Sequence, residues 1–355
     1  MHLGRRITGV VLVLMAISVG LVIAGVGSAS GSRTLRLGYV TGPLHPYGLA
    51  LTQFANQVAQ ASNGQLKIKL LPVYGGGNDL TLLNDEKGGT VDMGSVSSAV
   101  WDTEGVKSFQ ALQMPFLISN YKIEAAVLKS PVERQMLAGT SKLGLHGLAI
   151  HEGGLRKPAM NGPCITTATG FKGKKIRAVE SDLLVRSLTA LGANPTPLPL
   201  SDVYLALQNG TVKGMEANLG LIWTNKYYEV LKCVTGNANL WPFPTVLSMN
   251  NHTWKSLSSQ QQQWITTAAN RLPAESLAIV SDPKSPYVSE LCQKHIKFGT
   301  ASKSGLAGML AKEQPVYQHF EHNAQVKNFV TAIQKIKAKT RPPAPSAPYP
   351  AGCAA

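Results

Sequence analysis

The chain is poor in aromatic residues and in acidic residues. Aromatic side chains make up 6% of its 355 residues, and 19 Asp and Glu stand against 34 Lys and Arg, which gives a formal net charge of +15. So few aromatic residues disfavour a surface that stacks nucleic-acid bases, and no nucleic-acid motif accompanies the positive charge. That charge excess instead favours small anionic partners, which it attracts over long range.

The sequence motifs of common enzyme classes are also missing. The glycine-rich segment 75–78 lacks the lysine and the serine or threonine of a phosphate-binding loop, and no GxSxG motif occurs. His146 and His151 are five residues apart on a predicted strand, so their side chains point to opposite faces. His319 and His322 share a predicted helix, but two histidines alone make a weak metal site. We therefore predict no enzyme activity, no cofactor and no metal.

Cysteine is scarce, and its four copies are widely separated. Cys164, Cys233, Cys292 and Cys353 show neither a CxxC motif nor metal-ligand spacing. In an oxidising compartment we expect one disulfide among the first three, with the pairing unassigned. Cys353 falls in the Pro/Ala-rich segment 341–355, for which we predict a disordered tail.

The N-terminus has the pattern of an export signal. Arg5 and Arg6 precede an apolar stretch over residues 7–26, and small residues at 27–29 suit a cleavage site. An uncleaved membrane anchor is the alternative, since a stretch of this length can span a bilayer. Its many glycines weaken that alternative. We predict a signal peptide over 1–29 and a periplasmic protein.

The rest of the chain alternates between strand and helix patterns, which predicts an α/β fold with a mostly parallel sheet. Ser258 and Gln261 have the spacing of a capping box that opens a helix reaching about Leu272. The predicted strands are 34–39, 65–72, 91–96, 147–151 and 175–179; the predicted helices are 46–61, 79–86, 181–191, 201–208, 258–272, 285–296 and 326–337.

The segment 171–230 is the most informative. Arg177 is a permanently charged residue on a predicted strand, and Gly192 ends the helix that follows, as a residue tolerant of positive φ should. Pro195 to Pro199 form an extended segment, and Ser201 is the predicted cap of the next helix. Strand ends of open α/β sheets are where ligands bind. A guanidinium there can hold a carboxylate through two parallel hydrogen bonds.

Several motifs resemble the solute-binding proteins of TRAP transporters, which capture organic acids outside the cytoplasmic membrane. They are KIR (175–177), ALGA.PTP (190–197), DVYLALQNGTVKGME (202–216) and YYEV (227–230), with SNGQLKIK (62–69) and GGTVDMGSV (88–96) nearer the N-terminus. The resemblance covers about residues 34–335. It implies a two-lobed periplasmic-binding-protein-like fold with mixed, mostly parallel sheets, strand exchange between the lobes and a long C-terminal helical region. Lobe I would comprise 34–153 plus 243–282, and lobe II 154–242 plus 283–335.

The resemblance also implies ligand-binding residues. Arg177 matches the family arginine that clamps the ligand carboxylate, and Glu216 matches the family acid. Arg156 occupies the place of a second arginine near the ligand, with a structural role as the alternative. Ala217 stands where relatives often have asparagine, with Asn218 one step on, and Leu200 replaces an aromatic residue. These departures favour an organic acid other than sialic acid or a simple dicarboxylate.

Weaker candidates complete the predicted site. Ser97 and Ser98 stand where relatives direct polar side chains at the ligand, or they bond nearby backbone. Trp101 and Trp223 either line the cleft or pack in the core, and Tyr39 ends the first strand.

We predict a monomeric receptor that captures a carboxylate and delivers it to TRAP-type membrane permease subunits. A sensor or scavenging receptor of the same fold is the alternative, and a secreted enzyme is less favoured.

Overall fold

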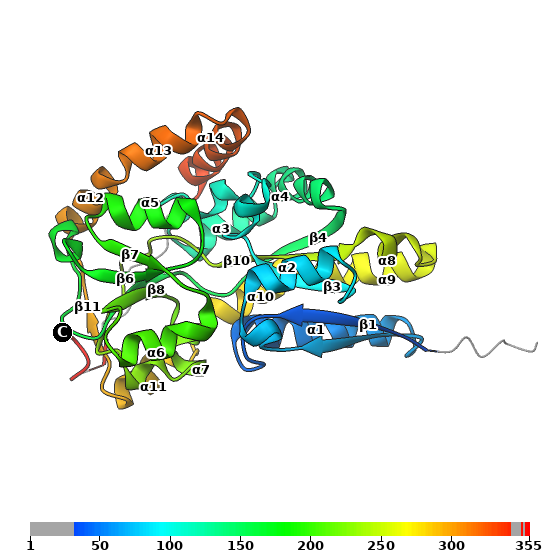
Figure 1. Cartoon of the computed structure of the whole chain (residues 1–355), viewed down its shortest axis with the longest axis horizontal. Coiled ribbons are helices and arrows are strands. Elements are labelled where there is room, and N and C mark those ends of the chain that lie inside the picture. Colours follow the sequence, from blue (N-terminus) through cyan, green and yellow to red (C-terminus); the bar gives the residue numbers. More distant parts are fainter. Residues whose placement is uncertain (1–31, 342–348, 351) are drawn as a thin grey trace, which may run out of the picture. The chain divides into compact units, whose positions relative to one another are not determined.

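Two mixed sheets organise the protein (Figure 1). The computed structural model describes residues 32–341, 349–350 and 352–355. The five-stranded sheet has the order β2-β1-β3-β10-β4, and the six-stranded sheet has the order β11-β9-β5-β8-β6-β7. The strands are β1 (Arg33–Tyr39), β2 (Leu66–Leu71), β3 (Met93–Ser97), β4 (Leu145–Glu152), β5 (Lys157–Met160), β6 (Lys175–Ala178), β7 (Asn194–Pro197), β8 (Gly214–Ala217), β9 (Cys233–Thr235), β10 (Pro244–Asn250) and β11 (Lys297–Gly299).

Each sheet contains parallel neighbours and one strand that runs antiparallel to the strands on both sides of it. In the first sheet β2, β1 and β3 are parallel, while β10 pairs antiparallel with both β3 and β4. In the second, β5 runs antiparallel to β8 and β9, and the remaining pairs are parallel. The predicted α/β class with mixed sheets and strand exchange is confirmed. We call the part around the first sheet lobe I and the part around the second sheet lobe II.

Each of the seven predicted helices has a counterpart in the structure, but seven further helices among the described residues were not predicted: α3, α4, α7, α8, α10, α12 and α13. The capping box of Ser258 and Gln261 is present at α9, and Gly192 follows α5 with a φ of 98°. The helices are α1 (Pro46–Ala61), α2 (Asp79–Lys87), α3 (Tyr121–Leu128), α4 (Pro131–Leu137), α5 (Asp182–Ala190), α6 (Val203–Gln208), α7 (Leu219–Thr224), α8 (Asn251–Lys255), α9 (Ser259–Ala269), α10 (Leu272–Val280), α11 (Tyr287–Gln293), α12 (Lys303–Lys312), α13 (Gln314–Glu321) and α14 (Ala324–Lys339).

One local prediction is wrong, and the structure makes a second one more specific. Ser201 does not cap α6, because a short 3-10 helix over Leu200–Asp202 precedes it and the Ser201 hydroxyl donates to Asp202. The extended segment after Gly192 is part of a sheet: β7 pairs in parallel with β6, with Thr196 opposite Arg177.

The C-terminal helices connect the two lobes. Helix α13 packs on α5 of lobe II, whereas α14 packs on α3 and on residues 110–113 of lobe I. The Lys337 ammonium donates to the Phe116 carbonyl, which fixes the end of α14 there. The predicted lobe II segment 283–335 therefore ends against lobe I.

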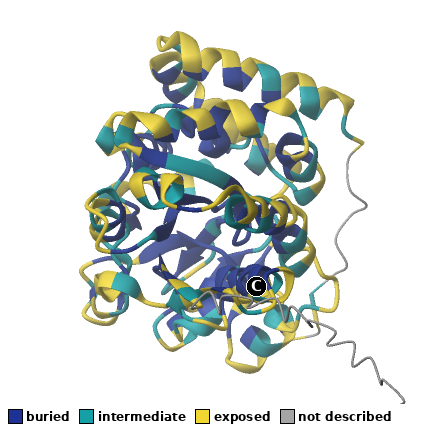
Figure 2. Cartoon of the chain, turned by 90° about the vertical axis from the view of Figure 1, so that its right-hand side faces the viewer, coloured by how far each residue is buried: buried dark blue, intermediate teal, exposed yellow. Residues whose placement is uncertain are grey.

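Burial is concentrated in the strands, while outward helix faces are exposed (Figure 2). The largest apolar cluster includes Trp101 and Phe109 of lobe I together with Ile176 and Leu184 of lobe II. Apolar contacts therefore join the two lobes.

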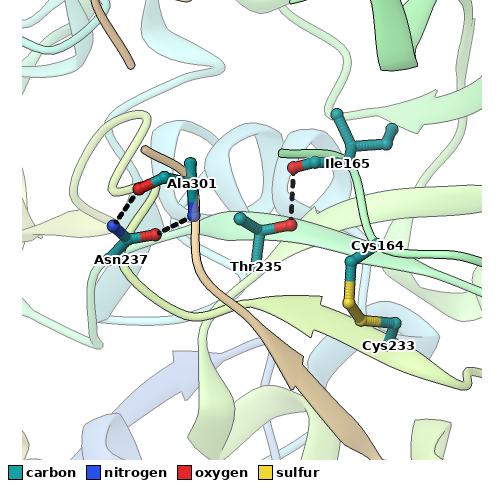
Figure 3. Close-up of a disulfide and its surroundings, with 6 residues drawn as sticks. All are labelled: Cys164, Ile165, Cys233, Thr235, Asn237 and Ala301. Carbon is teal, nitrogen blue, oxygen red and sulfur yellow. Dashed lines mark hydrogen bonds between the residues drawn. A yellow bond between two sulfur atoms is a disulfide. The ribbon is translucent and has the colours of Figure 1, made fainter. Parts of the chain in front are cut away.

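Two disulfides are formed, Cys164–Cys233 and Cys292–Cys353 (the first in Figure 3). Beside the first, the Thr235 hydroxyl donates to the Ile165 carbonyl at 2.6 Å. The expectation of one disulfide among the first three cysteines holds for Cys164–Cys233, but it missed the second bond.

The prediction of a wholly disordered tail over 341–355 is wrong at its end. Cys353 is bonded to Cys292, Tyr349 stacks on Phe298 at 4.8 Å, and the Phe298 amide donates to the Cys353 carbonyl. Residues 342–348 and 351 lie outside the described residues, as does the predicted signal peptide over 1–29. Within the described ranges, no helix has the length and apolarity needed to cross a bilayer.

Candidate functional site

Three adjacent strands of lobe II bring the two predicted arginines and Glu216 together. Arg177 is the third residue of β6, and Glu216 is the third residue of β8, the parallel neighbour of β6. Arg156 immediately precedes β5, which pairs with β8 so that Pro158 lies opposite Glu216. The site is therefore near the carboxyl ends of parallel strands, where open α/β sheets bind ligands.

Arg156 is neutralised within lobe II. Its Nε contacts a Glu216 carboxylate oxygen, and one Nη donates to the Glu216 carbonyl at 2.6 Å. Its guanidinium also lies 4.4 Å from the centre of the Phe243 ring. Burial and the nearby Arg177 charge lower the pKa of Arg156, while Tyr47, Tyr227 and Glu152 oppose this. Because its charge is already paired, Arg156 is better placed to position other groups than to bind an anion.

Arg177 is buried without such a partner. Its side chain is 3% exposed, and its Nε and one Nη donate to the Leu198 carbonyl at 2.9 and 2.6 Å. Among the described residues, no carboxylate oxygen lies within 4.0 Å of it. Burial lowers the pKa of Arg177, while Tyr227 and Asp79 oppose this. A buried cation that only a carbonyl contacts favours an anion in its neighbourhood.

Asp79 faces this cation from lobe I, and the sequence analysis missed it. It is the first residue of α2, and its Oδ1 accepts a hydrogen bond from the Ser97 amide at 2.8 Å. Burial raises the pKa of Asp79 to about 6, while the Ser97 amide, Arg177 and Arg156 act in the opposite direction. Asp79 is partly exposed. An acidic residue at the start of a helix is a common feature that stabilises the helix. The sequence pattern alone therefore did not indicate a further role for Asp79.

The residues that follow Glu216 have structural contacts. Ala217 is buried in the apolar cluster of lobe II. Asn218 caps α7, and its Oδ1 accepts from the Leu221 amide at 2.7 Å. Its amide group lies beside the buried His45 of lobe I, so it contributes to the contact between the lobes.

Ser97 and Ser98 are both buried at the carboxyl end of β3. The Ser97 amide binds Asp79, and its hydroxyl accepts from the Ala99 amide at 3.4 Å. The Ser98 hydroxyl has no hydrogen-bond partner among the described residues. Ser98 therefore keeps a buried polar group available near the site, whereas the Ser97 hydroxyl is engaged locally.

Aromatic candidates divide between core and surface. Trp101 is fully buried and packs edge-to-face on Phe109 at 5.3 Å, and Tyr39 belongs to the core of lobe I. Trp223 is half-buried on α7, with its ring 5.3 Å from that of Tyr228. The contacts of Trp101 and Tyr39 correspond to core packing.

A groove of about 370 Å³ separates the two lobes on one side. Leu200 and Tyr227 of lobe II line it opposite Val40 and Gly77 of lobe I. Tyr227 links the groove to the arginine: it is close enough for the Arg177 charge to lower its pKa against the raising effect of burial. Tyr227 therefore lines the groove and lies near the buried cation, whereas Arg177 itself does not line the groove.

The segments that cross between the lobes are tied together by Glu152. Its Oε1 accepts from the amides of Gly154 and Phe243 at 2.5 and 3.0 Å, and its own amide donates to the Ser276 hydroxyl. A second cavity, of about 340 Å³, lies beside these segments and includes neither arginine. We place the site at Arg177 because charge and strand geometry coincide there. Lys157 lines this second cavity, and its ammonium donates to the Leu155 carbonyl and to the side-chain oxygen of Asn239.

Comparison with known proteins identifies relatives over most of the chain. The model of the bacterial extracellular solute-binding protein family 7 (DctP) matches residues 37–323. The 2,3-diketo-L-gulonate-binding periplasmic protein of Escherichia coli is 28% identical over 267 residues, which cover 72% of this chain and 79% of the relative. The C4-dicarboxylate-binding periplasmic protein of Rhodobacter capsulatus is 27% identical over 274 residues, covering 77% and 80%.

Solved structures show the same fold. The sugar acid binding protein of Advenella mimigardefordensis, in complex with galactonate, superposes with a TM-score of 0.81 at 26% identity and covers 87% of this chain and 99% of its own. A TRAP periplasmic solute-binding protein of Ralstonia eutropha with bound 2-acetolactate gives a TM-score of 0.79 at 26% identity, covering 86% and 99%.

Proposed function

The chain belongs to family 7 of the bacterial extracellular solute-binding proteins, the TRAP solute-binding proteins, and we propose that it captures an organic acid through Arg177. The observation that carries this proposal is the state of Arg177, which is buried and has no carboxylate partner among the described residues. A ligand carboxylate would provide the missing anion and would accept charge-assisted hydrogen bonds. Galactonate and 2-acetolactate, the ligands of the two similar structures, are both carboxylic acids.

We further propose that the ligand carries hydroxyl groups. Asp79 approaches the arginines from the opposite lobe, and its second carboxylate oxygen can accept a hydrogen bond from a ligand hydroxyl. A second ligand carboxylate at that position would meet a like charge, which is unfavourable in a partly buried site. The buried Ser98 hydroxyl and Ser97 remain proposed contacts, as do Leu200 and Trp223 at the rim.

Capture would proceed by closure of the lobes. Arg177 would bind the carboxylate in an open cleft, and closure would remove water and strengthen the pair at a lower effective dielectric. Tyr227 and Asp79, from lobes II and I, would then both lie near the ligand. In this scheme Arg156 and Glu216 hold the floor of the site in place.

The closed receptor would deliver its ligand, as a monomer, to the permease subunits of a TRAP transporter. A sensor or scavenging receptor without a permease would use the same binding step. Neighbouring genes for a small and a large membrane subunit would favour transport, and a neighbouring histidine-kinase gene would favour sensing. A secreted enzyme remains the least supported alternative; turnover of a ligand that stabilises the protein would support it.

A thermal-shift screen over hydroxylated monocarboxylic acids, dicarboxylic acids and neutral sugars tests the proposal. A ligand at about 100 times its dissociation constant should stabilise the protein by about 2.7 kcal/mol. We expect sugar acids to do so, and the corresponding neutral sugars to have no effect. Stabilisation by a neutral sugar alone would contradict the role of Arg177, and stabilisation by succinate alone would contradict that of Asp79.

A further inference from the structure

Lysines gather at the amino ends of the strands in the six-stranded sheet. Lys175 begins β6 and Lys174 immediately precedes it. Lys213 immediately precedes β8, Lys232 immediately precedes β9, and Lys297 begins β11. All of these lysines are exposed, and so is Lys172 near the start of β6. We call these six residues the lysine strip; they are Lys172, Lys174, Lys175, Lys213, Lys232 and Lys297.

A continuous series of backbone hydrogen bonds aligns the strip. The Lys213 amide donates to the Lys175 carbonyl at 2.7 Å, and the Lys297 amide donates to the Lys232 carbonyl at 2.9 Å. Between them, β5 connects the two pairs: the Asn161 amide donates to the Lys213 carbonyl, and the Lys232 amide donates to the Met160 carbonyl. Four strand spacings separate β6 from β11, so the strip extends over roughly 20 Å across the amino ends of the strands.

The positive charge of the strip is not balanced locally. None of its lysines forms a salt bridge with any residue that the structure describes. All 19 acidic residues of the chain fall within the described ranges. The acid nearest to Lys232 in sequence is Glu229, whose carboxylate accepts the Tyr204 hydroxyl. Such uncompensated like charges repel one another in solution, and an external anionic surface would relieve that repulsion.

We propose that the lysine strip docks the protein on an anionic phospholipid surface. The strip contains lysines only, which act as hydrated point charges and suit diffuse attraction; no arginine offers a bidentate fork for one phosphate or carboxylate. The six lysines are exposed at the amino ends of the strands. None of them lines either of the cavities described above. A row of exposed lysines is the pattern that anionic headgroups attract through their surface potential.

Docking through the lysine strip would leave the ligand groove open for binding and release. β6, β8, β9 and β11 are mutually parallel, so the strip lies at their amino ends while Arg177 lies toward the carboxyl end of β6. The protein could therefore rest on a membrane with its ligand groove uncovered. This inference does not depend on the identity of the ligand or on the role of Arg177.

Vesicle co-sedimentation of the exported protein tests the proposal. Vesicles of equal parts phosphatidylglycerol and phosphatidylcholine should bind the protein at low salt, and vesicles of phosphatidylcholine alone should not. Replacing Lys174, Lys175, Lys213 and Lys232 by Gln should weaken binding by about tenfold or more. Lys297 is left unchanged, since its ammonium donates to the Gly352 carbonyl and holds the C-terminal segment.

A matched variant separates the strip from net charge. Lys67, Lys69, Lys142 and Lys255 are exposed lysines of lobe I outside the strip, and changing all four to Gln removes the same charge. We expect this variant to keep its vesicle affinity within about threefold of the wild type. Equal losses in both variants, equal binding to neutral vesicles, or no binding to anionic vesicles would each overturn the proposal. Unchanged melting temperatures would show that both variants fold.

Discussion

The two ends of the six-stranded sheet both carry positive charge, but in opposite physical states. At the carboxyl end, Arg177 is 3% exposed and fixed by two hydrogen bonds to one carbonyl. At the amino end, Lys174, Lys213 and Lys232 are exposed and form no salt bridge with the described residues. A buried, oriented cation selects a ligand by geometry, whereas exposed lysines attract any anionic surface and are screened by salt.

A second contrast exists within the carboxyl end itself. Arg156, just before β5, and Arg177, on β6, lie on either side of β8 and are both buried, yet only Arg156 has a carboxylate, Glu216, in contact. Charge pairing inside the protein thus distinguishes a cation that supports the fold from one that is available to a ligand. The four predictions below test these contrasts, from the largest expected effect to the smallest.

Arg156→Ala should reduce stability most. It leaves Glu216 buried without its partner, which costs about 3–5 kcal/mol. Chemical denaturation measures this loss. Replacing both partners, Arg156→Met with Glu216→Leu, should recover most of the lost stability, because no charge is then left unpaired. If Arg156→Ala were as stable as the wild type, the pair would not support the fold as described.

Arg177→Ala should reduce ligand affinity by about 2–5 kcal/mol, or roughly 30-fold to several thousandfold. The unfolding free energy of the ligand-free protein should change by only about 1 kcal/mol, since the change removes hydrogen bonds to a single carbonyl and no ion pair. Calorimetric titration and denaturation measure the two effects. A large loss of stability with unchanged affinity would reverse the roles assigned to the two arginines.

Asp79→Asn should change how stability depends on pH. The pKa of Asp79 is raised to about 6 by burial, so the folded state retains this proton at a pH where the unfolded chain has released it. The contribution of Asp79 to wild-type stability should therefore be largest below about pH 4 and be lost as the pH rises through 6, by on the order of 1 kcal/mol after allowance for partial exposure. The variant should lack this component in denaturation curves at pH 4 and pH 7. Parallel curves for both proteins would show that Asp79 is fully solvated.

The smallest effects are expected across the six-stranded sheet, because ligand binding at Arg177 and vesicle binding at the lysine strip should be independent. Replacing the four strip lysines by Gln should change ligand affinity by less than about twofold and stability by less than about 0.5 kcal/mol, as is usual for exposed positions. Conversely, Arg177→Ala should leave vesicle binding intact. If the lysine changes reduced ligand affinity, or if Arg177→Ala reduced vesicle binding, the two binding sites would not be independent.

Much of the fold could be predicted from local sequence patterns. Helix α1 has the predicted bounds, and the capping box at Ser258 and the positive φ at Gly192 are local rules that operate as expected. The second disulfide could not be predicted, because Cys353 follows a Pro/Ala-rich segment whose composition gives no indication of a tertiary contact.

The site was only partly predictable for a related reason. Arg177 is an arginine within a recognisable motif, and both features indicate carboxylate binding. It could therefore be proposed as a ligand-binding residue from the sequence. The role of Arg156 depends on its contact with Glu216, 60 residues away in sequence, and that of Asp79 on the approach of the opposite lobe. Both depend on long-range packing that no local pattern encodes.

The most direct test of the central claim is a crystal structure of the protein with a sugar acid found by the thermal-shift screen. The account predicts that the ligand carboxylate accepts hydrogen bonds from the guanidinium of Arg177, with the Arg156–Glu216 contact still in place. A bound acid whose carboxylate lies away from Arg177, or meets Arg156 after Glu216 has moved aside, would contradict it.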